Sequence, residues 1–531
     1  MVEGNKTCKK KKRFCFLHLD LGIGGAEQLI LNLARASLSV GDDSSNVNAV
    51  DIYTTHCDPN HCFQDVKPPD GIFCTRVHVC GAWIPKNFGG FSAAFCSHLR
   101  MIYLSMIVLF FLPTHPEEEI IYVVDVLPTP LVFLTNAFLL YWNSSRSNQS
   151  TAIFYCHFPD KLLKRDTING QTQLLPNNES NNKNNNIKSI LKSWYRNLFD
   201  WLEETSMSYA DLVCINSNFT LEKVQETFPS LDSSKLLVLH PPIRNHSDDQ
   251  KVKNTTTEVT NDKLTKPFVS LNRFERKKNV NILLKAYAKL LHNHPTNIGQ
   301  DRDNAHNIIT MDNNSSVIPP LIIAGGYDIH NKENLEHYQE LVSLAKDLNI
   351  PSSHIRFCKN ISDNERMDML QNALCVCYTP KWEHFGIVPL EAMYAGTPVI
   401  AWNCGGPKET VLHKQTGYLV DLSTDTNNDS EKEEILSWTM ALQYMIDNDN
   451  DSLWESRTKQ HVQNNFAWDT FVSTWEKHIS KAQTNSLKRH EVARKRLKML
   501  LLMILFITIS IMIIIYTFFI SHNTTTKYQE L

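Results

Sequence analysis

The sequence has no excess of charge of either sign. Its 531 residues include 53 Lys and Arg and 56 Asp and Glu, so the formal net charge is -3. A chain balanced in this way exerts no general attraction on nucleic acid, and any anion must be bound by a local group of basic residues. At 42% hydrophobic residues, and with about 150 residues per domain, the composition predicts two or three folded units.

The sequence also lacks a CxxC pair, and its 13 cysteines are scattered and odd in number. These features argue against a secreted disulfide framework and favour a reducing compartment. His and Cys cluster only in "HCDPNHC" at 56–62. A zinc site there would need a second ligand pair, and none follows at zinc-finger spacing, so a loop is the preferred interpretation.

The N-terminus shows no signal peptide, because His18 and Asp20 interrupt its apolar stretch. Long apolar runs are also rare, and the exception is 499–520, which has 22 residues without a charge. That length can cross a hydrocarbon core about 30 Å thick. Six Lys and Arg lie between Lys488 and Lys498, and only Lys527 follows the run. The positive-inside rule therefore predicts a C-terminal transmembrane anchor with the rest of the chain in the cytosol.

Two series of strand-like segments predict two parallel α/β sheets. The first opens with "RFCFLHLDLGIGGAEQLILNLARASL", which has the pattern of a strand, a glycine-rich turn and an amphipathic helix. It continues with "SSNVNAVDIYTT", "FCTRVHVC", "IIYVVDV", "TAIFYCHF" and "DLVCINS", and the second contains "PFVSLNRF", "PLIIAGGYD", "HIRFCKNI", "LCVCYTP" and "PVIAWNCGG". Alternating strands and helices are typical of doubly wound, Rossmann-like domains, whose ligands bind at the carboxyl ends of the strands.

The predicted organisation has four parts. They are an N-terminal Rossmann-like domain at 13–243, a polar linker or insertion at 244–266, a C-terminal Rossmann-like domain with a return helix at 267–480, and the anchor at 499–520. The Asn-rich stretches 169–186 and 293–316 lack apolar periodicity and are interpreted as disordered insertions.

Two further apolar stretches, 101–113 and 131–142, are too short to span a bilayer fully. Buried core is the preferred interpretation of both. The predicted anchor keeps a second interpretation open for 101–113, which is a surface lying on the membrane.

The stretch "WEHFGIVPLE" places Glu383 and Glu391 eight positions apart around a Phe-Gly pair. A continuous helix through Gly386 and Pro389 is disfavoured, so the first acid is predicted in a loop. A helix starting near Pro389 would hold the second acid in its first turn. Because a helix N-terminus favours anions, the pattern indicates a phosphate-bearing ligand flanked by two carboxylates.

Other motifs follow predicted strands and point to the same kind of ligand. "GIGGAE" contains Gly24 and Gly25, where backbone can approach a ligand closely. "NRFERKKN" supplies Arg273 and Lys278, cations suited to a diphosphate. His157 follows another strand in "FYCHFPD". A lone histidine is more often structural than catalytic. The position of His157 at the end of a predicted strand, where ligands bind, favours a functional role. Together the motifs indicate a nucleotide-sugar site.

"EHFGIVPLEAMYAGTPVIAWNCGGPKETV" resembles the E-x7-E signature of retaining glycosyltransferases of family 4, which have the GT-B fold of two Rossmann-like domains facing a cleft. "HLDLGIGGAEQLILNLA", "HFPDKLL", "NSNFT" and "FVSLNRFERKKN" are similar, more narrowly, to the dolichol-pathway α-1,3/1,6-mannosyltransferases of that family. The resemblance runs from Arg13 to His478, interrupted by the Asn-rich insertions. It implies a membrane enzyme of the endoplasmic reticulum with GDP-mannose as donor.

The resemblance also implies that the domain at 13–243 is the acceptor side and that the domain at 267–480 binds the donor. It implies site roles as well. Arg273 and Lys278 would bind the donor diphosphate and stabilise the leaving group, without a metal or other cofactor. Glu391 would bind the ribose, and Glu383 would contact the transferred mannose. The backbone of Phe385 and Gly386 would line the sugar-phosphate pocket.

Two further roles come from the same resemblance. His157 would lie near the transferred sugar, and Gly24 and Gly25 would face the donor phosphates or the acceptor.

The expected activity is retaining transfer of α-1,3- and α-1,6-linked mannose from GDP-mannose to a Man1GlcNAc2-diphosphate-dolichol type of acceptor in N-glycan precursor assembly. The expected partners are therefore GDP-mannose, the dolichol-diphosphate-linked oligosaccharide, the membrane and possible neighbouring pathway enzymes, with no nucleic acid. Two alternatives stay open from the sequence. One is another family 4 transferase acting on a different lipid-linked glycan, and the other is a non-catalytic membrane scaffold. Four charged residues at one predicted cleft disfavour the scaffold.

Overall fold

A computed structural model describes residues 11–40, 48–87, 93–112, 118–136, 150–163, 167–168, 171–172, 183–243, 266–293, 318–423 and 429–492. The anchor predicted at 499–520 lies outside these residues, as do nearly all of 244–266 and 293–316. By its internal contacts the chain forms two compact units. Unit 1 comprises 1–154, 201–213 and 476–531, and unit 2 comprises 155–200 and 214–475.

The first sheet has seven strands in the order β3-β2-β1-β4-β5-β8-β9. Its inner strand β1 pairs in parallel with both β2 and β4. Every strand predicted in the first series is present. The bounds are β1 (Lys11–His18), β2 (Ala49–Thr54), β3 (Val77–Val79), β4 (Glu118–Asp125), β5 (Ser150–Cys156), β8 (Leu212–Ile215) and β9 (Leu236–Val238).

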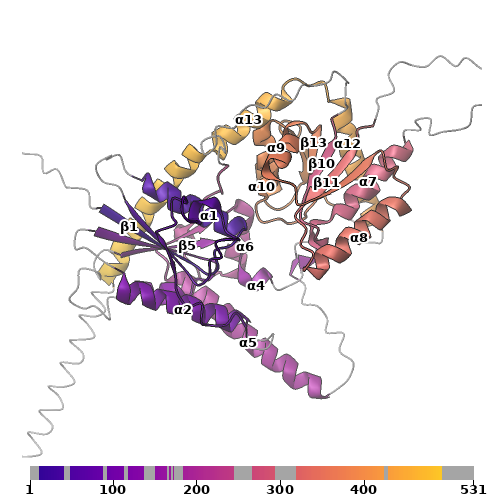
Figure 1. Ribbon diagram of the computed structural model, residues 1–531. Helices are drawn as coiled ribbons and strands as arrows, with labels where there is room; N and C mark the ends of the chain where they lie inside the picture. Colours follow the sequence, from indigo (N-terminus) through magenta and orange to yellow (C-terminus); the bar gives the residue numbers. More distant parts are fainter. Residues whose placement is uncertain are drawn as a thin grey trace, which may run out of the picture. The chain divides into compact units, whose positions relative to one another are not determined.

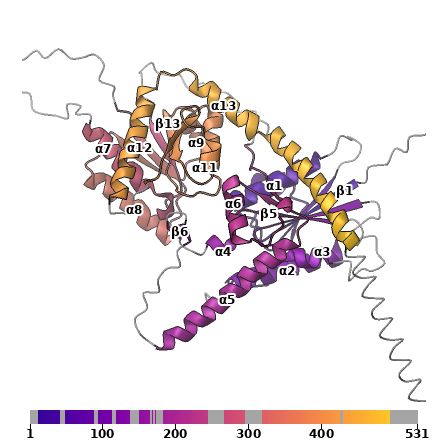
Figure 2. The same ribbon diagram turned by 180° about the vertical axis from the view of Figure 1, so that it is seen from behind.

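Helices cover this sheet on both faces. In Figures 1 and 2, α1 and α2 lie on opposite faces of the strands around β1. Other helices and short strands lie between the strands of the sheet in the sequence. The bounds are α1 (Gly25–Leu38), η1 (Gln64–Val66), α2 (Ala93–Phe111), α3 (Pro130–Thr135), α4 (Asp160–Leu163), β6 (Thr167–Ile168), β7 (Gln171–Thr172), α5 (Lys183–Ser208), α6 (Asn218–Thr227) and η4 (Ser233–Lys235).

The prediction that all of 169–186 is disordered is wrong in part. Gln171 and Thr172 form β7, and 183–186 belong to α5. The reason is that α5 continues into the apolar and aromatic residues of "SILKSWYRNLF", so its polar first turn extends a helix that the later residues favour.

The second sheet has six strands in the order β12-β11-β10-β13-β14-β15, and all of its pairings are parallel. This order is that of a doubly wound Rossmann domain. The sequence predicted five of these strands and missed β15. The bounds are β10 (Phe268–Leu271), β11 (Leu321–Gly325), β12 (Ile355–Lys359), β13 (Cys375–Tyr378), β14 (Val399–Trp402) and β15 (Gly417–Val420).

The second sheet is buried on both faces, as its continuous apolar strands require. One face packs on α7, α8 and α12, and the other packs on α9, α10 and α13 (Figure 1). The rings of Trp402 and Trp438 meet edge to face at 5.5 Å on the first side. The bounds are η6 (Arg276–Lys278), α7 (Val280–Asn293), α8 (Lys332–Asp347), α9 (Asp363–Gln371), α10 (Ile387–Ala395), α11 (Pro407–Thr410), α12 (Ser430–Asp447) and α13 (Trp454–Asn465).

A helix at 468–492 ends the described chain, and its later part belongs to unit 1. There Gln483 donates to Glu119 of β4 at 2.6 Å. The guanidinium of Arg489 binds both carboxylate oxygens of Asp211 at 2.8 and 3.0 Å. Since Asp211 is buried, this pair fixes the helix to the sheet.

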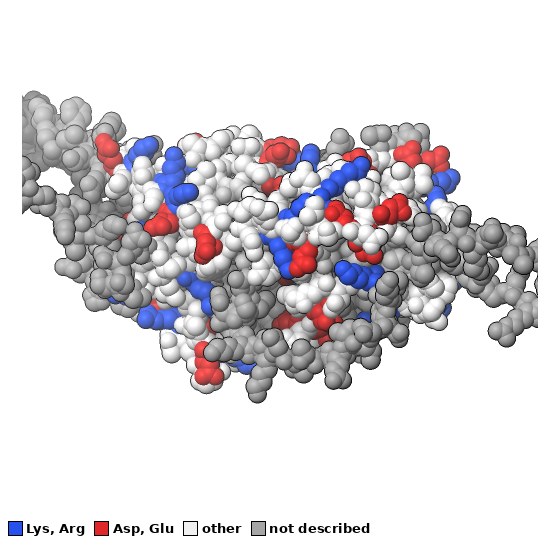
Figure 3. Space-filling model, turned by 90° about the horizontal axis from the view of Figure 1, so that it is seen from above, with Lys and Arg blue, Asp and Glu red and all other residues white. Residues whose placement is uncertain are grey.

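Among the described residues, α2 is the one helix long and apolar enough to cross a membrane. Less than half of it, 44%, is buried in the protein. Length and composition alone do not separate a membrane helix from a core helix, so both interpretations of 101–113 stay open. The face drawn in Figure 3 carries acidic and basic side chains interspersed, in keeping with the balanced composition.

Candidate active site

Lys278 and Glu383 form the centre of the candidate site. Lys278 follows β10 and Glu383 follows β13, two neighbouring strands at which the strand order of the sheet reverses. In doubly wound sheets, ligands bind at the carboxyl ends of the strands beside such a reversal. The ammonium Nζ of Lys278 donates to Glu383 Oε2 at 2.7 Å. Residues 105 positions apart in the sequence therefore form one charged pair at this end of the sheet.

The environment of Glu383 keeps its carboxylate ionised. Burial raises the pKa of Glu383, but the charge and hydrogen bond of Lys278 outweigh burial, and the net direction is downward. The hydroxyl of Tyr378, the last residue of β13, also donates to this carboxylate. In turn, burial and the charge of Glu383 raise the pKa of Tyr378 well above its ordinary value. Glu383 is thus a fixed negative charge at neutral pH.

Glycines let a second loop pack directly behind the Glu383 loop. The amide of Gly406 donates to the carbonyl of Glu383 at 2.8 Å. A Cβ on Gly405 would lie 2.6 Å from that carbonyl oxygen, and one on Gly406 would lie 2.3 Å from Cα of Phe385. The glycine turn after β14 therefore supports the acid from behind, because no side chain fits between the two backbones.

We expect Gly406→Ala to lower the free energy of unfolding by about 1–3 kcal/mol, since the added methyl forces the two loops apart. The φ of Gly406 is -60°, which suits alanine, so the clash alone causes the loss. Gly22→Ala is the matched control, because its nearest neighbour would be 3.9 Å from the new methyl. Denaturant titration of both variants measures the effect, and equal midpoints would contradict it.

Helix α10 begins two residues earlier than predicted. Gly386 adopts φ 81° and ψ 82° as its N-cap, and the first helical residue is Ile387. This left-handed conformation, which glycine tolerates, turns the chain into the helix before Pro389. Pro389 is still in the first turn, but Glu391 lies beyond it, so the prediction that Glu391 lies in the first turn is wrong.

The two remaining charged residues predicted for the site have other partners. Glu391 binds the guanidinium of Arg366 on α9. The side chain of Arg273 is 67% exposed and lies 3.4 Å from Glu275. Among the described residues, neither side chain forms a hydrogen bond or ion pair with Lys278 or Glu383. Of the four charged residues predicted for the site, only Lys278 and Glu383 are therefore in direct contact.

His157 lies on the same unit as Glu383 and directly follows β5. Its neighbour Phe158 stacks on the ring of His384 at 3.7 Å, with the planes 5° apart. The hydroxyl of Ser217 donates to the carbonyl of His384 at 2.6 Å. These contacts hold the backbone next to Glu383, and they bring His157 into its neighbourhood.

His384 itself is electrically neutral. Burial lowers the pKa of its imidazole to about 4, against the opposing effect of Glu383. The charge of Lys278 acts in the same direction as burial. His384 therefore adds an aromatic surface to the site and no charge at neutral pH.

The predicted glycines lie in unit 1. Gly24 is the N-cap of α1, and Gly25 is its first residue. A Cβ on Gly24 would lie 2.4 Å from the Glu27 carboxylate, whereas one on Gly25 would meet nothing within 4 Å. Gly25 thus has open space beside it, whereas a side chain at Gly24 would displace the carboxylate of Glu27.

Four contributors were missed by the sequence reasoning, namely Tyr378, His384, Ser217 and Arg366. Three of them had a usable signal. Tyr378 ends a predicted strand, Ser217 follows another, and His384 adjoins Glu383 in the quoted motif. Arg366 had none, because a basic residue within a polar helix usually faces solvent.

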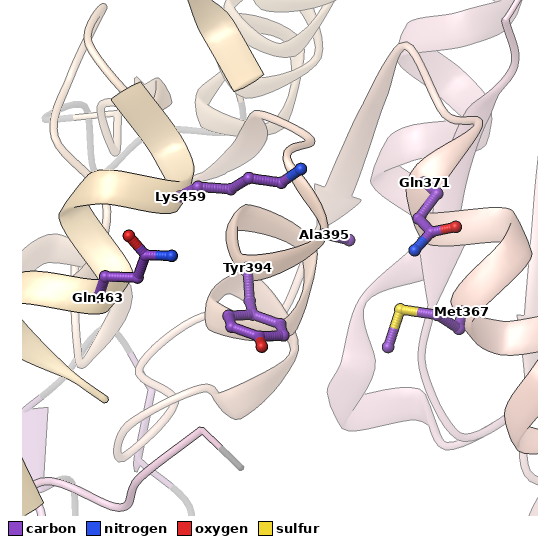
Figure 4. Close-up of a pocket in the computed structure, with 6 residues that line it drawn as sticks. All are labelled: Met367, Gln371, Tyr394, Ala395, Lys459 and Gln463. Carbon is purple, nitrogen blue, oxygen red and sulfur yellow. The ribbon is translucent and has the colours of Figure 1, made fainter. Parts of the chain in front are cut away.

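Two cavities in the described part of the chain lie away from this site. One of about 320 Å³ is lined by Met367, Gln371, Tyr394, Ala395, Lys459 and Gln463 (Figure 4). These residues come from α9, α10 and α13, and none belongs to the predicted site. The described residues also contain no group of three or more His, Cys, Asp or Glu that could hold a metal ion. The prediction of a loop at 56–62 is confirmed.

Comparisons with known proteins give the class of this chain, which is that of the glycosyltransferases. Residues 253–439 match the family model described as glycosyl transferases group 1. The solved sucrose-phosphate synthase from Thermosynechococcus elongatus aligns with a TM-score of 0.55 at 16% identity, covering 87% of this chain and 97% of that one. A glycosyltransferase from Rickettsia africae aligns at 0.52 and 16% identity, covering 90% and 98%. These structures establish the fold.

Curated relatives narrow the class to a family. The α-1,3/1,6-mannosyltransferase ALG2 of Mus musculus is 36% identical over 76% of this chain and 83% of its own length. The human protein of the same name is 36% identical over 77% and 84%, and that of Candida albicans is 33% identical over 77% and 87%. The chain belongs to this family of α-1,3/1,6-mannosyltransferases, as its motifs predicted.

Proposed function

We propose that this protein is a retaining mannosyltransferase that uses GDP-mannose. It adds α-1,3- and α-1,6-linked mannose to a Man1GlcNAc2-diphosphate-dolichol type of acceptor during N-glycan precursor assembly. The observation that carries the proposal is the pair of Lys278 and Glu383 at 2.7 Å, within a chain of this family. A cation and an ionised acid at one end of the sheet suit a substrate with a diphosphate beside a sugar.

Lys278 has the central role in this proposal. As the bond from the mannose to the diphosphate breaks, negative charge builds on the leaving group, and the ammonium stabilises that charge. Arg273, exposed on the same loop, closes on the diphosphate when the donor binds. The N-terminus of α10 at Gly386 adds unpaired N–H groups that favour the same anion.

The two acids have separate roles. Glu383 contacts the transferred mannose, and Glu391 binds the ribose of the nucleotide. Arg366 pairs with Glu391 and keeps its carboxylate oriented. The backbone of Phe385, whose side chain is buried, lines the sugar-phosphate pocket with Gly386.

His157 acts near the transferred sugar, and its neighbour Phe158 is already stacked beside the Glu383 loop. Gly24 and Gly25 in unit 1 face the donor phosphates or the acceptor. The open space at Gly25 supports this role, because a ligand can approach the backbone there.

The decisive test incubates the purified full chain with GDP-mannose and a synthetic Man1GlcNAc2-diphospho-lipid. Product masses should show two successive additions of a hexose, and linkage-specific mannosidases should identify one α-1,3 and one α-1,6 bond. A matched reaction with a phosphatidylinositol-linked glycan tests acceptor choice. Transfer to that glycan alone would assign the chain to a different acceptor.

Transfer should persist unchanged in EDTA. The reason is that Lys278, Arg273 and the N-terminus of α10 supply the positive charge that a divalent ion supplies in other nucleotide-sugar enzymes. Rates are compared with and without the chelator after extensive dialysis. Complete loss of transfer, restored by Mg²⁺ or Mn²⁺, would refute the metal-free assignment.

We further propose that 499–520 anchors the protein in the endoplasmic reticulum membrane with the catalytic units in the cytosol. The charge-free run and the basic residues before it support this topology. A distant glycosylation acceptor site appended to the C-terminus should be modified in microsomes. An unmodified acceptor together with a protease-protected catalytic region would reverse the orientation.

A further inference from the structure

A buried histidine and aspartate meet at the carboxyl edge of the first sheet. His18 is the last residue of β1, and Asp125 is the last residue of the neighbouring strand β4. Their exposed fractions are 1% and 0%. Ring nitrogen Nδ1 of His18 lies 2.8 and 2.9 Å from the two carboxylate oxygens of Asp125. Neither residue was singled out by the motifs of the site.

The second nitrogen of the same ring faces the glycine loop at 19–25. Nε2 of His18 lies 3.0 Å from the carbonyl oxygen of Asp20. A carbonyl and a carboxylate only accept hydrogen bonds, so both bonds form together only when both ring nitrogens carry a proton. With Asp125 ionised, the contacts fit a doubly protonated, cationic imidazole.

The charges around His18 support that protonation state. Burial alone lowers the pKa of His18, but the charge and hydrogen bond of Asp125, and then the charge of Glu27, outweigh it and raise the pKa above its ordinary value. Glu27 belongs to α1, with Oε1 4.0 Å from Nε2.

The remaining nearby charges largely neutralise each other. The carboxylate of Asp20 binds Arg100 of α2 at 2.5 Å and lies 3.7 Å from Lys86. His56 also acts on Asp20 through its charge. Asp125 and Glu27 are the acids whose charges act on His18.

The backbone just after Asp125 is strained. Val126 has φ 62°, a conformation that is unfavourable for a β-branched residue. Such strain persists only where surrounding contacts impose it, and it is common at functional sites. Here the turn is closed by the amide of Leu127, which donates to the carbonyl of Asp125 at 2.6 Å. The strained residue, Val126, therefore directly follows the residue that binds His18.

We propose that His18 is a positioning residue, whose doubly protonated ring ties the glycine loop at 19–25 to β4 and so holds the loop in its substrate-binding conformation. The inference rests on the proposed function, which assigns Gly24 and Gly25 of this loop to a substrate. The loop is also held by the bonds from Thr55 to the Leu19 carbonyl and from Leu21 to the His56 carbonyl, and by the ion pair of Asp20 with Arg100. The pKa of Asp20 is lowered and Arg100 stays protonated, so that ion pair keeps its charges from neutral to alkaline pH. The bond from His18 is therefore the one that is lost as pH rises.

The sign of the pH effect follows from the raised pKa of His18. Its contribution is complete below the pKa of an unfolded histidine and is lost as pH rises through the higher pKa of the folded state. Loss of the Nε2 proton leaves two acceptors facing each other and releases the loop. We take the acceptor as the substrate that this loop holds, so acceptor use should fall on the alkaline side.

The test measures kcat/KM for the lipid-linked acceptor, at saturating donor, from about pH 6 to about pH 9. Asp125→Asn removes the balancing charge at nearly constant shape, so the alkaline limb should move to lower pH by one unit or more, about tenfold in proton affinity. Glu119→Gln removes an acid from the other end of β4 and should leave the limb in place. Glu27→Gln, on a partly exposed side chain, should shift it in the same direction by less.

A second readout separates this inference from the proposed function. The melting temperature of the wild type should fall between neutral and alkaline pH more steeply than that of Asp125→Asn, whether or not any transfer is detected. If the wild type shows no transfer but its melting temperature still falls more steeply than that of Asp125→Asn, the proposed function is refuted and the role of His18 is not. The role of His18 would be overturned by three results together. Asp125→Asn would lose activity equally at every pH, and the alkaline limb of Glu27→Gln would stay where it is in the wild type. The melting temperatures of the wild type and Asp125→Asn would fall in parallel as pH rises.

Discussion

Lys278→Ala is expected to reduce kcat by roughly 30- to 1,000-fold, because a charge-assisted contact to a developing diphosphate contributes about 2–4 kcal/mol to stabilisation of the transition state. The fold should survive. The backbone of Lys278 is held independently of its side chain, since its carbonyl accepts a 2.6 Å bond from the Thr379 hydroxyl. Steady-state kinetics with circular dichroism as a check on folding make the measurement.

Lys277→Ala is the matched control for this variant. Lys277 adjoins Lys278, but its side chain is 71% exposed and its recorded partner is Glu275 at 3.1 Å. Exposed ion pairs contribute little, so transfer should stay within about twofold of the wild type. If Lys277→Ala and Lys278→Ala behave alike, the loop acts through its net charge and the specific role of Lys278 is wrong.

The same substitution should also move the acid limb of the pH profile. Lys278 is the main cause that lowers the pKa of Glu383 against burial, so without Lys278 that pKa rises. A carboxylate with a depressed pKa loses its charge as pH falls through the folded value, and a raised value means that this loss occurs at higher pH. Activity of Lys278→Ala should therefore decline on the acid side earlier than that of the wild type.

The sequence could predict the parts of the site that follow from strand order. Because Lys278 and Glu383 each come soon after a predicted parallel strand, both had to lie at one edge of the sheet. The strand alternation that placed them is a repeated apolar pattern, which a single sequence displays clearly. The fold class and the family motifs depended on the same local signals.

Contacts between side chains from distant segments could not be predicted in this way. The pairing of Arg366 with Glu391 depends on how α9 packs beside α10, and that packing follows from many apolar contacts in the core. The early start of α10 depends on the left-handed backbone conformation of Gly386. A glycine in the sequence allows that conformation but does not predict it. Likewise, His18 looked like an interruption of an apolar strand, and its partner Asp125 is 107 positions away.

Glu383→Gln is expected to lower kcat by roughly 100- to 1,000-fold, which corresponds to about 3–4 kcal/mol, while leaving the protein folded. Glutamine has the same shape and can still accept hydrogen bonds from Lys278 and Tyr378, but it carries no charge to oppose the ammonium or to orient the sugar. Glu391→Gln should differ by raising the KM for the donor. Titration of the donor at saturating acceptor distinguishes these outcomes, and pure KM effects of equal size would contradict separate roles.

Combining Glu383→Gln with Lys278→Ala tests whether the pair works as a unit. The two side chains are in direct contact at 2.7 Å, so their effects should not add, and the double variant should be only slightly slower than the worse single variant. Both mannose additions should fall together, since the described chain offers this charged pair for each of them. Full additivity would mean that Lys278 and Glu383 act on the substrate independently. Loss of one linkage with the other intact would require a second site for mannose transfer.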